Sequence, residues 1–152
     1  MQIARARHRI AAYLFDCAIV YSISILILAR PLVLLIKTLN STTSIDVINL
    51  FINSIVSGGI VLIFIIFYCV IIPYLFKGQT IGKKFFRIKI VKIDGSNVSL
   101  GTLFVREIIG KILVDFICLG TSVIADGFVL VNSENHLTFY DVLASTMVVD
   151  VL

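Results

Sequence analysis

The sequence has 152 residues, enough for one domain, with 59% hydrophobic residues, 14% charged residues and a formal net charge of +4. Typical soluble domains contain about 45–50% apolar and about 25% charged residues, so the composition excludes an ordinary soluble fold and indicates an integral membrane protein. The basic residues flank apolar runs and do not form a separate arm with interleaved aromatic residues, which argues against nucleic acid as a partner.

Two apolar runs are long enough to cross a bilayer. Residues 10–29 form the first, because about 20 helical residues cross the hydrocarbon core, and residues 55–76 form the second. Pro31 follows directly on Arg30, so we expect the first helix to end or kink there. The first run also resembles a signal peptide, but it is too long, contains Asp16 and has no A-x-A cleavage site, so we interpret it as a retained span.

Basic residues before the first span and after the second predict the orientation. They are Arg5, Arg7, Arg9, Lys77, Lys83, Lys84, Arg87, Lys89 and Lys92. By the positive-inside rule, the N-terminus and the loop after the second span face the cytoplasm. Within that loop, apolar and basic residues alternate up to Asp94-Gly95, a favoured hairpin turn, which predicts a short β-hairpin over residues 84–99. An unstructured basic linker is the alternative.

The third apolar stretch carries embedded charges. They are Arg106, Glu107, Lys111, Asp115 and Asp126. Glu107, Lys111 and Asp115 are four residues apart and form one stripe along a helix, which Ser99 is placed to cap. A single helix over this stretch would be about 48 Å long, more than the core requires.

We therefore expect helices over 100–118 and 122–132, separated near Gly120 and entering and leaving the membrane from the cytoplasmic side, with a tail over 133–152. The alternative is an interfacial helix followed by one full crossing, which places the C-terminus outside. The predicted fold is an all-α membrane protein with two transmembrane helices, a C-terminal membrane helical hairpin and a short cytoplasmic β-hairpin.

Charges inside hydrocarbon are costly, so we expect them to face protein or water and to pair. Arg9 and Asp16 are two helical turns apart, too far for direct contact, and we expect Arg9 to extend to the lipid headgroups. Asp16 then needs another partner. Arg106 and Lys111 are the candidate cations, and Asp141 is a second carboxylate that could join them.

Five motifs occur in order: RxxAxxxD (9–16), GQTIGKK (78–84), RIKIVKIDG (87–95), VRE (105–107) and TFYDVLASTMVV (138–149). Together they resemble the RDD family of small bacterial membrane proteins. The resemblance implies that the arginine and two aspartates in the family name are Arg9, Asp16 and Asp141. It also implies a helical membrane domain for which ligand transport is suggested and cation/proton exchange is proposed. Tyr140 stands where the family pattern has His or Gly.

The predicted site is a polar cluster of Arg9, Asp16, Arg106, Glu107, Lys111, Asp115 and Asp141. We expect a transport protein of the bacterial cytoplasmic (inner) membrane that moves protons or monovalent cations past this cluster. It should be a homo-oligomer, because two spans and a hairpin are too little to enclose a path. The alternative is a non-transporting scaffold whose cluster is structural. In both cases anionic lipid is the expected partner of the basic loop.

No nucleophile, metal or cofactor motif occurs, so the sequence predicts neither an enzyme nor a bound cofactor or metal. GQTIGKK is one residue short of P-loop spacing, and its glycines are expected to shape the exit of the second span. Cys17, Cys69 and Cys118 are widely spaced within apolar runs and are expected to be small buried side chains.

Overall fold

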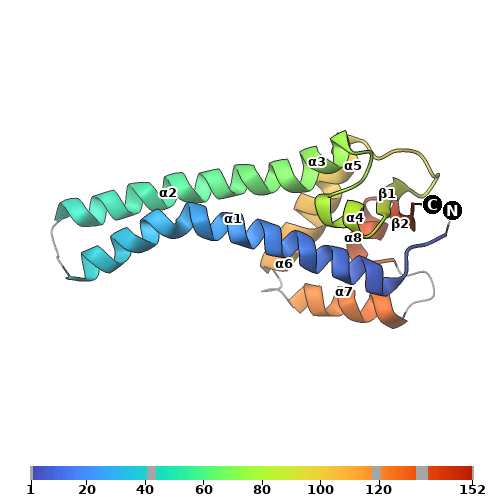
Figure 1. The fold of residues 1–152 in the computed structure, drawn as a ribbon, viewed down its shortest axis with the longest axis horizontal. Coiled ribbons are helices and arrows are strands. Elements are labelled where there is room, and N and C mark those ends of the chain that lie inside the picture. Colours follow the sequence, from blue (N-terminus) through green and yellow to red (C-terminus); the bar gives the residue numbers. More distant parts are fainter. Residues whose placement is uncertain (1, 41–43, 118–120, 133–136, 152) are drawn as a thin grey trace. The chain divides into compact units, whose positions relative to one another are not determined.

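The computed structural model describes residues 2–40, 44–117, 121–132 and 137–151, which are mostly helical (Figure 1). The chain divides into two compact units. Unit 1 comprises Met1–Asp16 and Phe67–Leu152, and unit 2 comprises Cys17–Ile66. Helix α1 (Ala6–Asn40) begins in unit 1 and continues into unit 2.

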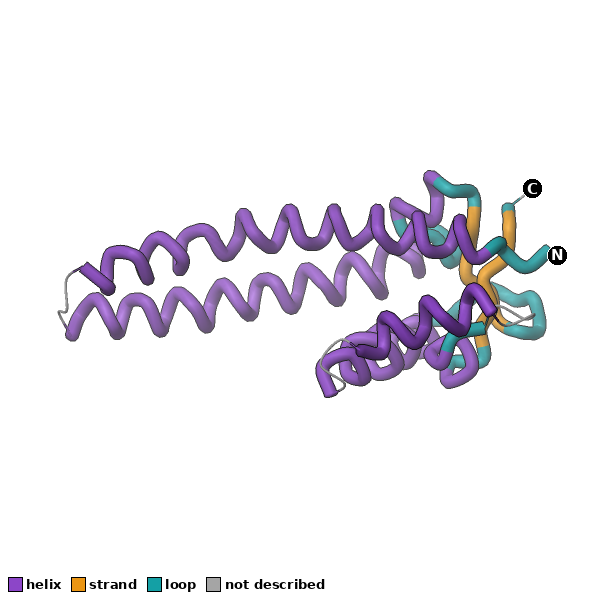
Figure 2. Tube along the Cα trace, turned by 90° about the horizontal axis from the view of Figure 1, so that it is seen from below, coloured by secondary structure: helices purple, strands orange, loops and turns teal. Residues whose placement is uncertain are grey.

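Unit 2 consists of the second part of α1 and helix α2 (Ser44–Ile66), which lie side by side (Figures 1 and 2). At Arg30-Pro31 we expected the first helix to end or kink, and an end is wrong, because Pro31 lies inside α1. A proline removes one backbone hydrogen bond, and a helix of apolar residues tolerates this loss where neighbouring groups compensate. Helix α2 begins at Ser44, well before the predicted residue 55. Apolar residues also occur between the polar residues of its first turns.

Burial in unit 2 is the reverse of burial in a soluble protein. Leu26 is 75% exposed and Phe51 and Ile63 are each 68% exposed, whereas Ser24 and Ser57 are buried. The candidate membrane spans are Ala6–Leu39 and Asp46–Leu75, both long and apolar enough to cross a membrane. Small residues between helices with large apolar side chains outside are typical of helices packed in lipid.

Polar side chains of unit 2 bond to their own helix. Ser22 donates to the Ala18 carbonyl at 2.7 Å, and Ser54 donates to the Leu50 carbonyl at 2.8 Å. This bonding to the carbonyl four residues earlier satisfies a hydroxyl without water. These exposed serines are therefore compatible with an apolar environment.

Unit 1 is built from short elements. They are η1 (Phe67–Ile71), α3 (Ile72–Leu75), α4 (Ile81–Phe85), β1 (Ile88–Lys92), α5 (Leu100–Phe104), η2 (Val105–Leu113), α6 (Val114–Ile117), α7 (Thr121–Asn132), α8 (Phe139–Leu143) and β2 (Thr146–Asp150). Both η elements are π-helices. Helical structure covers most of the predicted segments 100–118 and 122–132, and the expected break at Gly120 lies outside the described residues. Ser99 caps α5 as predicted, accepting from the Thr102 N–H at 3.2 Å.

The small sheet joins two distant segments. Strand β1 pairs antiparallel with β2 (Figure 2). Ile90 lies opposite Val148, and Ile3 forms an isolated bridge to Val149. The predicted local hairpin over 84–99 is therefore wrong in its second strand. The chain does turn at Gly95, but the residues that follow, Ser96 and Asn97, are exposed, whereas β2 offers apolar residues that complete the core.

Gly78 connects the second apolar helix to this sheet. Its φ is +94°, and an added Cβ would lie 2.1 Å from the Ile90 carbonyl oxygen. The Gly78 carbonyl accepts the Ile90 N–H at 2.8 Å. This close approach confirms that a glycine of the GQTIGKK motif shapes the exit of the second helix. Among the cysteines, Cys17 and Cys69 are half-buried free thiols and less buried than expected, and Cys118 lies outside the described residues.

Candidate functional site

Asp141 binds two arginines from different parts of the chain. Its Oδ1 lies 2.7 Å from Nη2 of Arg106, and its Oδ2 accepts from Nη2 of Arg9. Asp141 is fully buried, and Arg106 and Arg9 are 2% and 6% exposed. The expected extension of Arg9 to lipid headgroups is therefore wrong, because the Asp141 carboxylate gives its guanidinium a partner inside unit 1. A buried carboxylate between two guanidinium groups forms strong, charge-assisted contacts.

Local structure places Asp141 for this role. It is the third residue of α8, and its Oδ2 accepts the Thr138 N–H at 3.1 Å in a capping box. Burial by itself would raise the pKa of Asp141, but the guanidinium groups of Arg106 and Arg9 outweigh burial and hold the pKa below its usual value. Asp141 is therefore ionised at neutral pH.

Glu107 is the centre of a second, looser group of charges. Its carboxylate lies 3.8 Å from Nζ of Lys83, 3.8 Å from Nζ of Lys111 and 3.5 Å from Nε of Arg106. The predicted pairing of Glu107 with Lys111 along one stripe is confirmed. Burial lowers the pKa of Lys83, and the nearby Glu107 carboxylate offsets this only in part. The Asp115 side chain lies outside the described residues.

The π-helix η2 carries most of these charges. Arg106, Glu107 and Gly110 are its buried residues, and π-helical turns occur often at functional sites. An added Cβ at Gly110 would lie 2.9 Å from Cβ of Tyr140, so η2 packs closely on α8. The Lys111 ammonium lies 4.1 Å from the ring centre of Tyr13, and the Arg106 guanidinium lies 5.3 Å from that of Tyr140.

Asp16 has neutral hydrogen-bond donors as its partners. Tyr68 donates its hydroxyl to Oδ1 at 2.5 Å, the Gly82 N–H donates to Oδ1 at 2.8 Å, and the Thr80 hydroxyl donates to Oδ2. The expected pairing with Arg106 or Lys111 is not among these contacts. Three donors already satisfy much of the carboxylate, so a cation is not needed to stabilise it there.

Gly82 has to be a glycine for this contact to form. An added Cβ would lie 2.5 Å from the Ala12 carbonyl oxygen and 2.8 Å from Oδ1 of Asp16. Sequence reasoning missed Tyr68, Thr80 and Gly82. The available signals were the GQTIGKK motif and a tyrosine hydroxyl inside an apolar run, where a polar group needs a partner.

A cavity of about 210 Å³ in unit 1 borders both charged groups. Its cationic lining residues are Arg9, Lys83, Arg106 and Lys111, and its acidic ones are Asp16, Glu107 and Asp126. Asp141 is not among these lining residues but is bound to two of the cations. Among the described side chains, four cations and four carboxylates therefore balance in formal charge. Of the predicted cluster, the structure brings together every member whose side chain it describes, and it adds Lys83 and Asp126.

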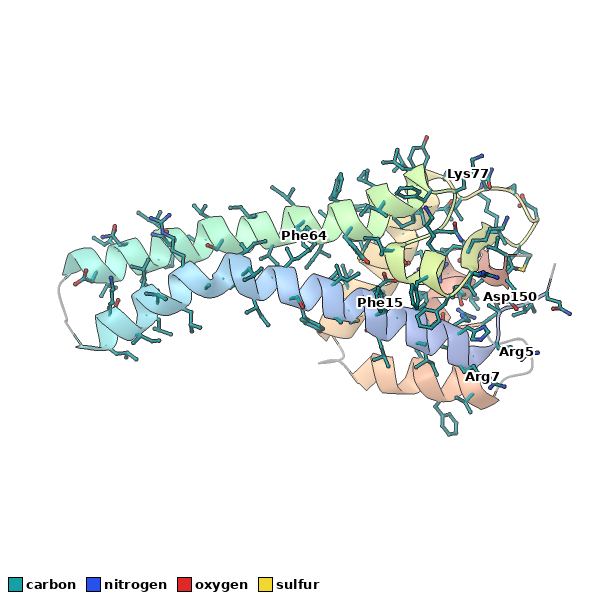
Figure 3. The ribbon with its side chains drawn as sticks, in the orientation of Figure 1. Arg5, Arg7, Phe15, Phe64, Lys77 and Asp150 are labelled. Atoms are coloured by element: carbon teal, nitrogen blue, oxygen red, sulfur yellow. The ribbon has the colours of Figure 1, made fainter. Side chains whose placement is uncertain are left out.

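Other basic residues of unit 1 lie at its surface. Figure 3 labels Arg5, Arg7 and Lys77, whose side chains are all exposed. They are separate from the buried and half-buried cations that line the cavity. The chain thus has one set of cations paired with carboxylates inside unit 1 and another that is accessible to a charged surface.

Comparison with known proteins gives a family match. The sequence model of the RDD family matches residues 3–145. A relative from Bacillus subtilis (strain 168), described as "Uncharacterized protein YckC", is 38% identical over 84 residues, which cover 55% of each chain. The match thus spans about half the length of that relative. No solved structure matches this chain.

Proposed function

Because the chain belongs to the RDD family of membrane-type proteins, we propose that it is a membrane transport protein and that the cavity in unit 1 is its binding site. One observation carries this proposal. Buried charges of both signs line a cavity of about 210 Å³, instead of packing against one another without a gap. Ionisable groups that face a cavity in a membrane protein are typical of ion and substrate pathways.

The distances divide the carboxylates into two kinds. Asp16 and Asp141 make contacts of hydrogen-bond length, so we assign them to holding the elements together. Glu107 lies 3.5–3.8 Å from its three cations, which is longer than a hydrogen bond. We propose that Glu107, with Asp126 on the cavity lining, exchanges these contacts for a proton or a monovalent cation.

For the membrane arrangement, we propose a multi-pass protein of the bacterial cytoplasmic (inner) membrane. The first span is α1, the second is α2 with η1 and α3, and the N-terminus faces the cytoplasm. Helices α5 to α7 then enter and leave the membrane from the cytoplasmic side. We further propose a homo-oligomer, with anionic lipid bound by the exposed basic residues. The proposal assigns no catalytic reaction, cofactor or metal to the chain.

A scaffold or accessory protein without transport activity is the second candidate. The contacts of Arg9 and Arg106 with Asp141, and those of three donors with Asp16, support it. Such contacts fix the positions of α1, α8, η1 and η2 whether or not anything moves through the cavity. In that case the buried charges stabilise the fold, and only the exposed basic residues bind a partner.

Ion flux into vesicles reconstituted with the full chain tests this proposal. We expect wild-type protein to move protons or a monovalent cation, and Glu107→Gln and Asp126→Asn to reduce that flux roughly tenfold, as removing one charged contact does. Asp94→Asn is the matched control, because Asp94 is exposed and bonds to Ser96 in a loop away from the cavity. Wild-type protein that moves neither protons nor Li⁺, Na⁺ or K⁺ would overturn transport of these ions and favour the scaffold.

A further inference from the structure

Arg106 has more hydrogen-bond donors than its described partners use. Its side chain is 2% exposed, and its Nη2 binds Asp141. Nε and Nη1 are buried without a hydrogen-bond partner among the described residues, and Nε only approaches Glu107 at 3.5 Å. Buried donors without a partner are costly, and Arg106 also lines the cavity. Among the described residues, two donors of Arg106 therefore lack an acceptor, which a ligand would supply.

We infer that the cavity binds a small ligand with one carboxylate group, which the Arg106 guanidinium receives. The inference goes beyond the proposed function, because it adds a carboxylate to the proton or monovalent cation proposed for the same cavity. A guanidinium is planar and matches the planar carboxylate, with which it forms short charge-assisted hydrogen bonds.

The volume of the cavity suits a small ligand. Its volume of about 210 Å³ exceeds the roughly 150 Å³ of a cavity that holds benzene, but is below the roughly 300 Å³ of the smallest pockets for drug-sized ligands. Leu14, Leu130 and Val148 contribute apolar lining, which suits a short hydrocarbon chain. A short-chain carboxylate therefore fits the cavity better than a nucleotide or sugar phosphate.

Charge balance indicates what accompanies the ligand. The four cations and four carboxylates that the structure describes at the cavity cancel, so a carboxylate that enters alone adds one negative charge without a described counter-charge. An uncompensated buried charge is strongly unfavourable. We therefore expect the ligand to bind as a carboxylate together with one proton, which one of the carboxylates at the cavity takes up.

Calorimetric titration of the full chain in detergent, with propionate as the probe, tests the inference. We expect propionate to bind at least roughly tenfold more tightly than propionamide, its neutral counterpart, because only the former makes charge-assisted contacts. Titration in two buffers of different ionisation enthalpy should show uptake of about one proton per propionate. Equal binding of propionate and propionamide, or binding of chloride as tight as that of propionate, would overturn the inference.

Two variants and one control locate the binding site. Leu130→Phe adds volume to a buried lining residue without changing any charge, and we expect it to abolish propionate binding. Leu100→Phe is the control, since Leu100 is 41% exposed and outside the cavity lining. Arg106→Lys should also lose binding, but Arg106 supports Asp141, so the unfolding temperature has to be measured with it. Propionate binding that survives a folded Leu130→Phe variant would place the site elsewhere and overturn the inference.

The outcome separates this inference from the proposed function. Propionate binding without any flux of protons, monovalent cations or propionate in vesicles supports the ligand class and overturns transport. Proton or cation flux without propionate binding supports transport and overturns the ligand class.

Discussion

Units 1 and 2 use buried polar residues in opposite ways. Among the described residues of unit 2, the buried polar ones are the small serines Ser24 and Ser57, and residues such as Leu26 are largely exposed. In unit 1 the buried polar residues include charged ones such as Arg106 and Asp141, which lie close to an apolar cluster with Ile90. Unit 2 thus has an outer surface suited to lipid, whereas unit 1 buries the charges of Arg106 and Asp141 as a pair. Substitutions in each unit test this difference.

The largest effect is expected at Asp141. Asp141→Asn removes the charge shared by Arg9 and Arg106 and leaves two buried cations without it, which should cost about 3–5 kcal/mol of unfolding free energy. Thermal or denaturant unfolding in detergent measures this loss. Asp150→Asn is the control, because Asp150 (Figure 3) is half-buried in β2 and outside the paired cluster. Equal stability of the two variants would show that the pairing in unit 1 contributes little.

The next effect concerns the surface of unit 2. Leu26→Lys places a charge on an exposed position of a candidate span, at a cost of about 2.5–3.5 kcal/mol if that position faces the bilayer centre. The fraction of protein that stays in membranes after an alkaline carbonate wash should fall several-fold. Ile93→Lys, at a 58% exposed position in unit 1, should leave that fraction unchanged. An unchanged fraction for Leu26→Lys would contradict a lipid-facing surface on unit 2.

A smaller effect is expected at the contact between Asp16 and Gly82. Gly82→Ala brings a methyl group against the Ala12 carbonyl and the Asp16 carboxylate, and overpacking of this kind costs about 1–3 kcal/mol. Gly101→Ala is the matched control, since nothing lies within 4 Å of its added Cβ. We expect a lower unfolding temperature for Gly82→Ala alone. If both variants unfold at the wild-type temperature, α4 does not depend on a close approach to Asp16.

The smallest effect is expected from mild acid. Because the folded-state pKa of Asp141 lies below its usual value of 3.8, its stabilisation is complete above that value and is lost as the pH falls through the folded pKa. The difference in unfolding temperature between wild type and Asp141→Asn should be the same at pH 7 and pH 5, and should shrink below about pH 4. A difference that already shrinks between pH 7 and pH 5 would mean that Asp141 is not held ionised by its two arginines.

Local patterns were sufficient to predict most helices and the membrane character of the chain. Apolar length predicted α1 and α2, and four-residue spacing predicted the pair of Glu107 and Lys111. The continuation of α1 to Asn40 was not predicted, because a proline signals an end or a kink unless its surroundings compensate.

Local sequence patterns could not predict which charged residues, far apart in the sequence, would pair with one another. Arg9, Arg106 and Lys111 were all available cations, and nothing in the spacing showed that Asp141 would bind two of them while Asp16 took neutral donors. The family resemblance pointed to Arg9, Asp16 and Asp141, and the structure places two of these three in direct contact. Their pairing depends on how unit 1 packs.

The sheet also has a consequence for the order of assembly. Strand β1 ends at Lys92, and its partner β2 begins only at Thr146, so synthesis has to pass residue 146 before pairing can start. Asp141, which holds Arg9, is also made late, whereas α2 follows α1 after a few residues. Unit 2 therefore depends on contacts of low contact order and unit 1 on contacts of high contact order, which form more slowly. Newly made Arg9 and Arg106 consequently lack their counter-charge until Asp141 has been synthesised, whereas the helices of unit 2 can already associate.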